Sequence, residues 1–269
     1  QLAGQVVEYD NLIGHHQQDV RGTQHIRVNG RGQTRLNIAH TVVAKITNQP
    51  AIEARQTRNA RHPVTGLEGL DEIQRIGALV ALLLDAINQS ETLRKRLFCT
   101  EFLTTLSGDA LITLIYHKPL NEAWEQEARA LQETLGVPIL GRSRKQKLVL
   151  ERDYVIEKLD IDGRTYQYKQ VEGSFTQPNG DICRSMIQWA RSCCEDESGD
   201  LLELYCGNGN FTIPLAEKFR KVLATEISKV SVNAAQENIA ANGVENLAIV
   251  RLSSEEFTQA IHKVRPFRR

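Results

Sequence analysis

From about residue 78 onward, the hydrophobic positions of the chain follow regular periods. Apolar side chains recur at helical spacing over residues 78–88, which predicts an amphipathic helix. Residues 97–106 and 110–117 alternate apolar with polar positions on either side of a Ser-Gly-Asp turn, which predicts a β-hairpin. Further periodic segments predict a helix at 121–135 and strands at 137–140, 147–150 and 164–171.

The expected helix at 121–135 has sequence signals at both ends. Asn121 is a suitable N-cap, and Gly136 can adopt the left-handed conformation that ends a helix. Together with the predicted strands, this helix indicates an α+β central domain over residues 78–179.

A second pattern starts near residue 180. Residues 181–194 predict a helix whose apolar face is formed by Ile182, Met186, Ile187 and Ala190. Strands and helices then alternate, with strands expected at 200–206, 222–225 and 248–252 and helices at 211–219, 229–241 and 254–262. This alternation predicts an α/β fold with a parallel, doubly wound sheet, half of which lies within residues 180–269.

Residues 1–77 differ from the rest of the chain. They contain one aromatic residue, Tyr9, and hold five of the seven histidines, while arginine outnumbers lysine eight to one. So few large apolar side chains cannot bury a core that offsets chain entropy. Three interpretations stay open: a flexible arm that touches RNA, a folded piece without a recognisable pattern, or sequence from a wrong reading frame or chimeric join. The last fits best the abundance of histidine beside so little lysine and serine.

Composition narrows the class of protein. The formal net charge is zero, so the whole chain is no basic RNA-binding protein, although a local basic face is compatible with this balance. The five cysteines fit no zinc or iron–sulfur spacing, and an odd count argues against a disulfide framework. No apolar run of membrane-spanning length and no signal peptide occur. We expect a monomeric, cytoplasmic protein that binds neither metal nor membrane. The first residue, Gln1, and a single methionine, Met186, indicate a fragment.

The strongest chemical motif is a glycine-containing turn between a predicted strand and helix. Gly207 and Gly209 allow a tight turn and let a ligand lie against the backbone. Glu226 ends the following strand, where an acid accepts hydrogen bonds from ribose hydroxyls in nucleotide-binding βαβ units. The turn lacks the three-glycine dinucleotide fingerprint, which favours S-adenosyl-L-methionine over NAD. The alternative is an ordinary βα turn followed by a surface glutamate.

Three segments identify a family. The run Asp-Leu-Leu-Glu-Leu-Tyr-Cys-Gly-Asn-Gly-Asn-Phe at 200–211 resembles the RNA uracil-5-methyltransferase family, as do Ser-Phe-Thr-Gln-Pro-Asn at 174–179 and Val-Leu-Ala-Thr-Glu-Ile at 222–227. Residues 97–107 and 116–118 also resemble its bacterial tRNA branch, which forms 5-methyluridine in the T loop. The resemblance covers residues 78–269 and not residues 1–77. It implies a partial class I methyltransferase sheet after a small RNA-binding-type domain, with tRNA as partner.

The resemblance also implies roles for individual residues. Gln177, Tyr205, Asn210 and Glu226 would contact the cofactor S-adenosyl-L-methionine, beside Gly207 and Gly209. Each side chain also has a structural alternative. Gln177 could cap the helix that follows Pro178, and Tyr205 could belong to the core.

Phe98 is a candidate for RNA contact. It follows Leu-Arg-Lys-Arg at 93–96, and a basic patch beside an aromatic ring can neutralise phosphates and stack an unpaired base. The alternative is a solvated helix end with Phe98 in the core. The family opens the T loop near this position, which favours RNA.

The mechanism implied by the resemblance is covalent. A cysteine thiolate adds to carbon 6 of uracil, carbon 5 takes the methyl group, and a carboxylate base removes the carbon-5 proton. The family's Ser-Cys-Asn-Pro and Asp-Pro-Pro-Arg segments are absent from this sequence, and Cys206 does not match the nucleophile. We therefore expect no catalytic residue within the chain and no methyl transfer by the chain alone. Two alternative functions are a noncatalytic RNA-binding module with a vestigial nucleotide fold and a class I methyltransferase with another substrate.

Overall fold

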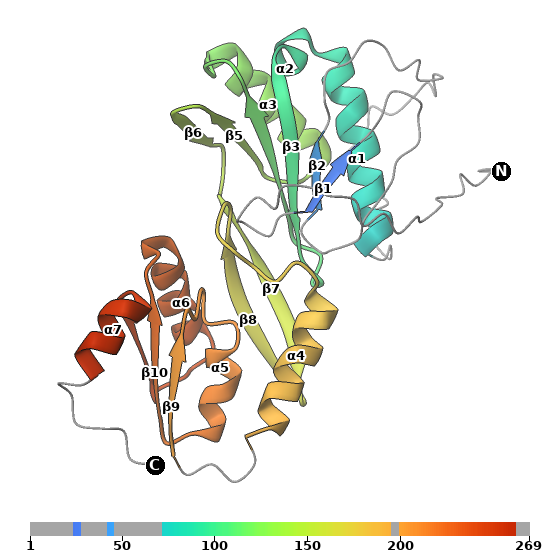
Figure 1. The fold of residues 1–269 in the computed structure, drawn as a ribbon. Coiled ribbons are helices and arrows are strands. Elements are labelled where there is room, and N and C mark those ends of the chain that lie inside the picture. The colour runs from blue at the N-terminus through green and yellow to red at the C-terminus, as the bar shows by residue number, and fades with distance from the viewer. Residues whose placement is uncertain (1–23, 28–41, 46–71, 195–198, 262–269) are drawn as a thin grey trace. The chain divides into compact units, whose positions relative to one another are not determined.

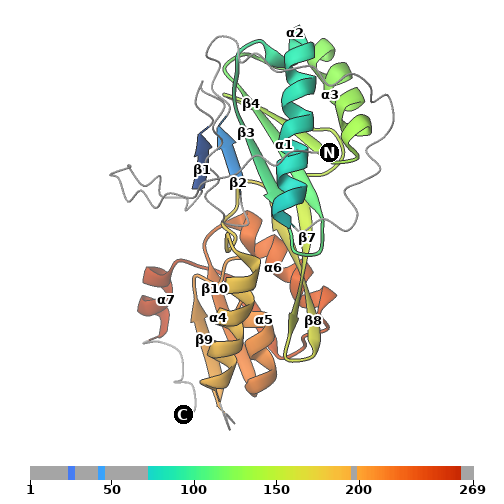
Figure 2. The ribbon, with the colours of Figure 1, turned by 90° about the vertical axis from the view of Figure 1, so that its right-hand side faces the viewer.

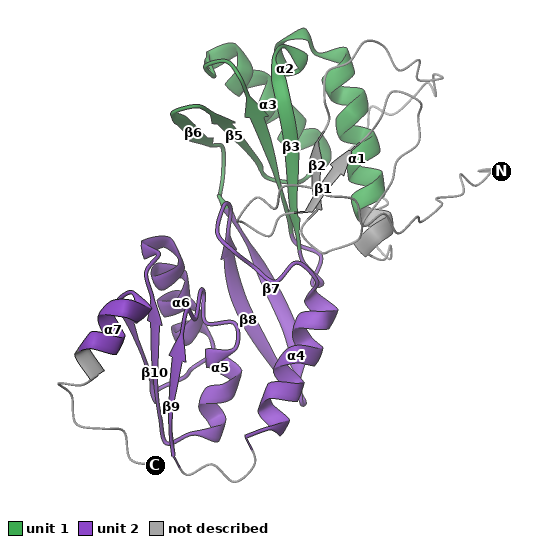
Figure 3. Cartoon of the chain, viewed as in Figure 1, with its two compact units in different colours: residues 1–104, 110–153 green, residues 105–109, 154–269 purple. Residues whose placement is uncertain are grey.

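A computed structural model describes residues 24–27, 42–45, 72–194 and 199–261 of the chain (Figure 1). The chain divides into two compact units, one of residues 1–104 and 110–153 and the other of residues 105–109 and 154–269 (Figure 3). The division follows Asp153, so residues 154–179 belong to the second unit, whereas the sequence pattern grouped them with the first. Among the described residues, no helix is both long enough and apolar enough to cross a lipid bilayer.

The first unit is built on a four-stranded mixed sheet in the order β3-β4-β5-β6. The strands β3 and β4 form the expected antiparallel hairpin, β4 and β5 are parallel, and β5 and β6 form a second hairpin. Its strands are β3 (Leu97–Thr104), β4 (Ala110–Tyr116), β5 (Ile139–Ser143) and β6 (Gln146–Val149), and its helices are α1 (Glu72–Gln89), α2 (Glu91–Arg94) and α3 (Glu122–Leu135).

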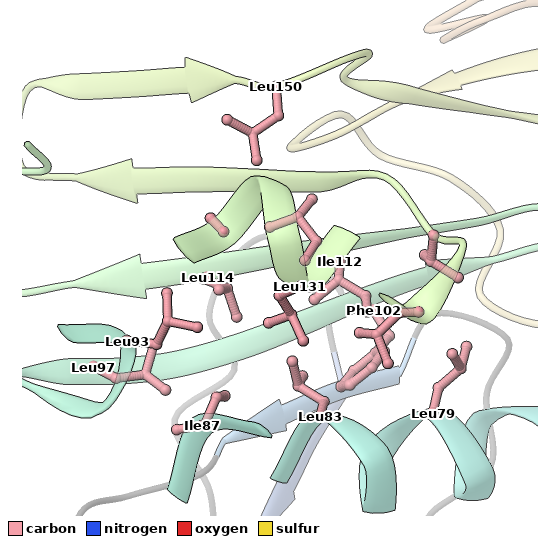
Figure 4. Packing of buried hydrophobic residues seen from close by; sticks show 14 of the residues in the cluster. Leu79, Leu83, Ile87, Leu93, Leu97, Phe102, Ile112, Leu114, Leu131 and Leu150 are labelled. Atoms are coloured by element: carbon pink, nitrogen blue, oxygen red, sulfur yellow. The ribbon is translucent and has the colours of Figure 1, made fainter. Parts of the chain in front are cut away.

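The core of the first unit lies between this sheet and its helices. Leu79, Leu83 and Ile87 of α1 pack towards Phe102 of β3 (Figure 4), and Trp124 of α3 is fully buried in the same cluster. These α1 residues recur at helical spacing, which is why the sequence identified the helix. The helix begins at Glu72, six residues before its predicted start.

The ends of α3 confirm the capping prediction. The Asn121 side chain accepts a hydrogen bond from the Trp124 amide, and Gly136 adopts the left-handed conformation with φ 62°. The predicted strand at 137–140 is wrong in its bounds, because β5 extends to Ser143 and pairs with β4 only from Ile139.

Only two short strands before residue 72 are described. β1 (Gln24–Arg27) and β2 (Val42–Lys45) pair in parallel. The three interpretations of residues 1–77 concern a segment that lies almost wholly outside the described residues, and they stay predictions.

The second unit begins with a hairpin that the sequence pattern recognised only in part. β8 (Arg164–Val171) has the predicted bounds, but its antiparallel partner β7 (Tyr154–Ile161) was missed. Tyr166 and Tyr168 of β8 are fully buried in a cluster with Ile187 of the following helix α4 (Gly180–Ser192).

The predicted apolar face of α4 is wrong for Ile182 and Met186 and correct for Ile187. The helix buries Cys183, Ile187 and Arg191, whereas Ile182 is 55% exposed and Met186 is 40% exposed. The three buried residues follow one another at intervals of four positions, so they lie on one face of the helix, towards the β7–β8 hairpin. Ile182 and Met186 lie on another face and form a second apolar stripe there.

Arg191 is buried on the inner face of α4 because it is fully paired. It forms ion pairs with Asp162 in the β7–β8 turn, at 2.8 Å, and with Glu217, at 3.1 Å, and donates to the Pro214 carbonyl. A buried charge requires such partners.

A three-stranded parallel sheet in the order β11-β10-β9 completes the second unit and confirms the predicted α/β class. Its strands β9 and β10 are labelled in Figure 2. The helix expected at 211–219 is divided into one α-helical turn and a 3-10 turn, a common tightening of short helices. The elements are β9 (Asp200–Leu204), α5 (Thr212–Leu215), the 3-10 turn Ala216–Lys218, β10 (Lys221–Glu226), α6 (Lys229–Ala241), β11 (Leu247–Arg251) and α7 (Ser254–Ile261).

Candidate functional site

The glycine-containing turn lies at the carboxyl end of β9, as predicted. Tyr205, Gly207 and Gly209 all have positive φ, at 59°, 58° and 84°. The Cys206 amide between them donates to the Thr225 carbonyl at 3.0 Å and so extends the pairing of β9 with β10. A non-glycine residue with positive φ is uncommon, and such strain often marks functional sites.

The two glycines serve different purposes. A Cβ atom on Gly209 would lie 3.1 Å from the Ile213 side chain, so Gly209 allows the turn to pack tightly against α5. A Cβ atom on Gly207 would meet nothing within 4 Å. The backbone of Gly207 therefore faces open space, where a ligand can approach it.

Glu226 holds the turn through its carboxylate. One oxygen accepts from the Gly207 amide at 3.0 Å, and the other accepts from the Ser228 amide at 2.8 Å. Ser228 in turn N-caps α6 through its side chain. A carboxylate offers about four lone-pair positions, so Glu226 keeps acceptor capacity for a ligand after making these two bonds.

Asn238 on the buried face of α6 ties the turn to the β7–β8 hairpin. Its amide nitrogen donates to the Asn208 carbonyl at 2.9 Å, and its carbonyl oxygen accepts from the Lys169 amide at 2.7 Å. One helical turn later, Asn242 pairs with both the amide and the carbonyl of Gln167. The two asparagine side chains thus form hydrogen bonds with the backbone of β8 of the kind that a neighbouring strand would form.

Sequence analysis did not identify Asn238 and Asn242. The available signal was two amide side chains four residues apart on a helix whose other inward positions are small or apolar, such as Val232 and Ala235. A buried polar side chain requires hydrogen-bond partners, so this pattern indicated a partner in the tertiary structure.

Asn210 closes the turn from the other side. Its side-chain nitrogen lies 2.9 Å from the Cys183 sulfur of α4, and its carbonyl accepts from the Tyr168 hydroxyl at 3.1 Å. The predicted contact residue Asn210 therefore directs its amide towards α4, where it fixes the turn.

Tyr205 does not belong to the core, which removes the structural alternative considered for it. Its side chain is 66% exposed. Ile227, immediately after Glu226, is 57% exposed. Ile227 was not predicted as a site residue from the sequence. Its position directly after Glu226, the acid that ends β10, was the available signal. The two side chains give the site apolar surface on which a nucleoside base can pack.

Gln177 lies in the segment before α4, and no hydrogen bond within the described residues joins it to the turn. The helix is capped instead by Asn179, whose side chain accepts from the Ile182 amide at 2.8 Å. The capping role considered for Gln177 is therefore wrong, and its contact with a cofactor stays a prediction.

Glu203 adds a buried carboxyl group beneath the turn. Burial raises its pKa to about 6, and the neighbouring Thr212 hydroxyl reduces this shift. Its Oε2 atom has no hydrogen-bond partner among the described residues. Burial also raises the pKa of Cys206 to about 12, with Glu203 and Glu226 adding to the shift.

Phe98 lies at the start of β3 in the first unit. Its ring is half-buried and meets the His117 ring edge-on, with 4.2 Å between the ring centroids. The side chain is therefore only partly in the core, and its contact with RNA stays a prediction.

Comparisons with known proteins match the sequence of this chain to one family. The sequence profile described as tRNA (Uracil-5-)-methyltransferase matches residues 59–269. A tRNA/tmRNA (uracil-C(5))-methyltransferase of Pseudomonas putida is 59% identical over 196 residues, which is 73% of this chain and 54% of that protein. A protein of the same name from Chromohalobacter salexigens is 59% identical over 189 residues, 70% of this chain and 51% of that protein.

The chain spans about half the length of these curated relatives. Among solved structures, the Pyrococcus abyssi tRNA (uracil-54, C5)-methyltransferase in complex with S-adenosyl-L-homocysteine is 16% identical, with a TM-score of 0.49 over 66% of this chain and 47% of that one. The profile match starts before residue 78, so residues 59–77, which the sequence motifs left unassigned, are included in it. With its profile match and its relatives in agreement, the chain belongs to the tRNA (uracil-5-)-methyltransferase family.

Proposed function

We propose that this chain supplies the cofactor turn and part of the RNA-binding surface of an S-adenosyl-L-methionine-dependent enzyme that methylates carbon 5 of uracil in tRNA, in the T loop. The observation that supports this most directly is the turn at 205–210, whose backbone is fixed in a ligand-accessible form by Glu226. The family to which the chain belongs adds the substrate class.

The residues of the turn fit a nucleoside cofactor. Gly207 leaves its backbone open, Glu226 keeps lone pairs for ribose hydroxyls, and Tyr205 and Ile227 expose apolar surface for a base. When bound, S-adenosyl-L-methionine supplies an electrophilic methyl group. The contribution of these side chains is to bind and orient it, and to exclude water from one side.

Three of the five cysteines, Cys99, Cys183 and Cys206, are too buried to suit the role of nucleophile, and the family resemblance assigns no such role to Cys193 or Cys194. The thiolate is the reactive form, and burial raises the pKa of both Cys206 and Cys183. Cys99 is also buried, in the first unit. We infer that the chain binds cofactor and RNA but transfers no methyl group by itself.

Two measurements on the whole chain test this proposal. Calorimetric titration with S-adenosyl-L-homocysteine should show binding at one site, and a radiolabelled transfer assay on unmodified tRNA should show no methylated uridine. Absence of cofactor binding would overturn the assignment of the turn. Stoichiometric methylation of uridine would overturn the inference that the nucleophile is not among these cysteines.

A further inference from the structure

Three segments of the first unit that are distant in sequence meet at one end of its sheet. β3 starts there, β4 ends there, and the β5–β6 hairpin turns there, because β4 is antiparallel to β3 and parallel to β5. The strand ends bring together Lys95 and Arg96, then Lys118, and finally Arg144 and Lys145. These five residues are called the strand-end surface below.

Hydrogen bonds tie the three segments to one another. The Lys118 ammonium donates to the Thr92 carbonyl at 2.9 Å, and the Ser143 hydroxyl donates to the Lys118 carbonyl at 2.7 Å. The His117 amide donates to the carbonyl of Arg96, which has a φ of 58°. The positions of these backbones are therefore fixed relative to one another.

Four of the five cations of this surface lack a paired acid among the described residues. Lys95, Arg96, Arg144 and Lys145 are exposed, and within the described ranges none of them forms an ion pair or a side-chain hydrogen bond. The pKa of Lys118 is lowered by burial and then by the positive charge of Lys95, while Glu127 acts in the opposite direction. Glu127 itself accepts a hydrogen bond from the Ser90 hydroxyl.

The turn of the β5–β6 hairpin carries two cations at its tip. Arg144 and Lys145 occupy the two positions between β5 and β6. Two-residue hairpin turns favour asparagine, aspartate and glycine. That preference applies where turn residues have positive φ, and neither Arg144 nor Lys145 does. Both positions therefore accept long side chains without strain and present two positive charges at the tip of the hairpin.

We propose that the strand-end surface binds the phosphate backbone of the RNA, with the Arg144-Lys145 turn extending the contact beyond the Phe98 region. The inference rests on the proposed function and adds to it the surface that meets the RNA. The four strands span about 14 Å at a spacing of about 4.8 Å, a width that accommodates several backbone phosphates.

RNA fits this surface better than a lipid membrane does. The half-buried Phe98 ring and the exposed His117 ring lie among the cations, and aromatic rings beside a basic surface are typical of single-stranded RNA contacts. Membrane-surface binding requires large apolar side chains that insert between lipids. None of the exposed large apolar residues described lies in the segments 92–98, 116–118 or 142–147.

The test measures binding of the whole chain to an unmodified tRNA transcript over a series of salt concentrations, without cofactor. The double variant Arg144→Ala/Lys145→Ala should bind at least several-fold more weakly, and its slope of log affinity against log salt should be smaller by between one and two units, about 0.7–0.9 per lost phosphate contact. The matched control Lys158→Ala/Lys221→Ala removes the same charge from exposed positions of the second unit and should keep the wild-type slope.

Equal slopes for the hairpin variant and the wild type would overturn the proposal, as would equal reductions in both double variants or no RNA binding at low salt. Binding of phosphatidylserine vesicles in place of RNA, lost in the hairpin variant, would also overturn it. Titration with S-adenosyl-L-homocysteine in the same preparations reports separately on the proposed function. If no preparation bound S-adenosyl-L-homocysteine while the hairpin variant still showed the smaller salt slope, the proposed cofactor site would be wrong and the proposed RNA-binding surface would be supported.

Discussion

The cofactor turn in the second unit and the strand-end surface in the first are constructed in opposite ways. At the turn, Glu226, Asn208 and Asn210 are each held by hydrogen bonds within the protein. At the strand-end surface, Lys95 and Lys145 are exposed and unpaired among the described residues. One region fixes its backbone before a ligand arrives, and the other leaves its side chains free to adapt.

The difference follows from what each region would recognise. A small cofactor is selected by shape, so its site benefits from a backbone held in advance. A phosphate backbone is recognised chiefly by charge, with release of counterions, and mobile cations serve well. We therefore expect substitutions at the turn to change stability and cofactor affinity together, and substitutions of the cations at the strand-end surface to change RNA affinity and its salt dependence without changing stability.

The largest expected effect concerns Asn238. Asn238→Leu leaves the Asn208 carbonyl and the Lys169 amide without their partner, and each unsatisfied buried group costs about 1–3 kcal/mol. The Lys169 carbonyl keeps the hydrogen bond that it accepts from the Asn208 side chain. We expect the free energy of unfolding to fall by about 2–4 kcal/mol and cofactor affinity to fall as well. Urea denaturation and calorimetric titration measure both. Asn233→Leu, on the exposed face of the same helix, is the matched control, and a similar loss in this variant would remove Asn238 from its positioning role.

The next effect concerns Glu226. Glu226→Ala removes the proposed ribose acceptor and releases the Gly207 amide, and a hydrogen bond to a charged group is worth about 1.5–3 kcal/mol, or more than tenfold in affinity. Titration with S-adenosyl-L-homocysteine measures the change. Glu237→Ala, which removes an exposed partner of Lys169, should bind as the wild type does. Equal affinities for Glu226→Ala and the wild type would exclude Glu226 from the site.

Phe98 tests whether stacking accompanies charge at the strand-end surface. Phe98→Ala should weaken RNA binding by about 1–3 kcal/mol if one base stacks on the ring, without altering the salt slope, because stacking neutralises no phosphate. The variant also loses the edge contact with His117, so its thermal midpoint must be compared with that of Phe98→Leu. RNA affinity equal to the wild type in both variants would assign Phe98 to the core.

The smallest effect is a pH dependence beneath the turn. The folded-state pKa of Glu203 is raised from 4.5 to about 6, so the folded form favours the protonated carboxyl. Below pH 4.5 Glu203 is protonated in both the folded and the unfolded chain, so its burial costs no stability. As the pH rises through about 6, the free energy of unfolding of the wild type falls by up to about 2 kcal/mol. Glu203→Gln lacks this titration. Its unfolding free energy relative to the wild type should therefore increase between these pH values and then level off. A pH-independent difference, measured by urea denaturation, would contradict the prediction.

Much of the local structure was predictable because its signals are short-range. Asn121 and Gly136 mark both ends of α3, and the Ser-Gly-Asp turn marks the β3–β4 hairpin. The turn at 205–210 was predicted with its place at the end of a parallel strand. The face of α4 was predicted wrongly, because Ile182 and Met186 are as apolar as Ile187 and only the position of the β7–β8 hairpin distinguishes them.

By itself, the sequence determined most of the helices and strands between residues 78 and 261, the glycine-containing turn at the end of β9 and the family to which the motifs point. These features depend on residues within a few positions of one another, where periodicity, caps and backbone preferences act directly. Only the tertiary structure decided that Asn238 pairs with Lys169, 69 residues away, and that Lys95, Lys118 and Arg144 share one end of a sheet. Such contacts depend on the path of the chain, because a side chain carries no local signal of its distant partner.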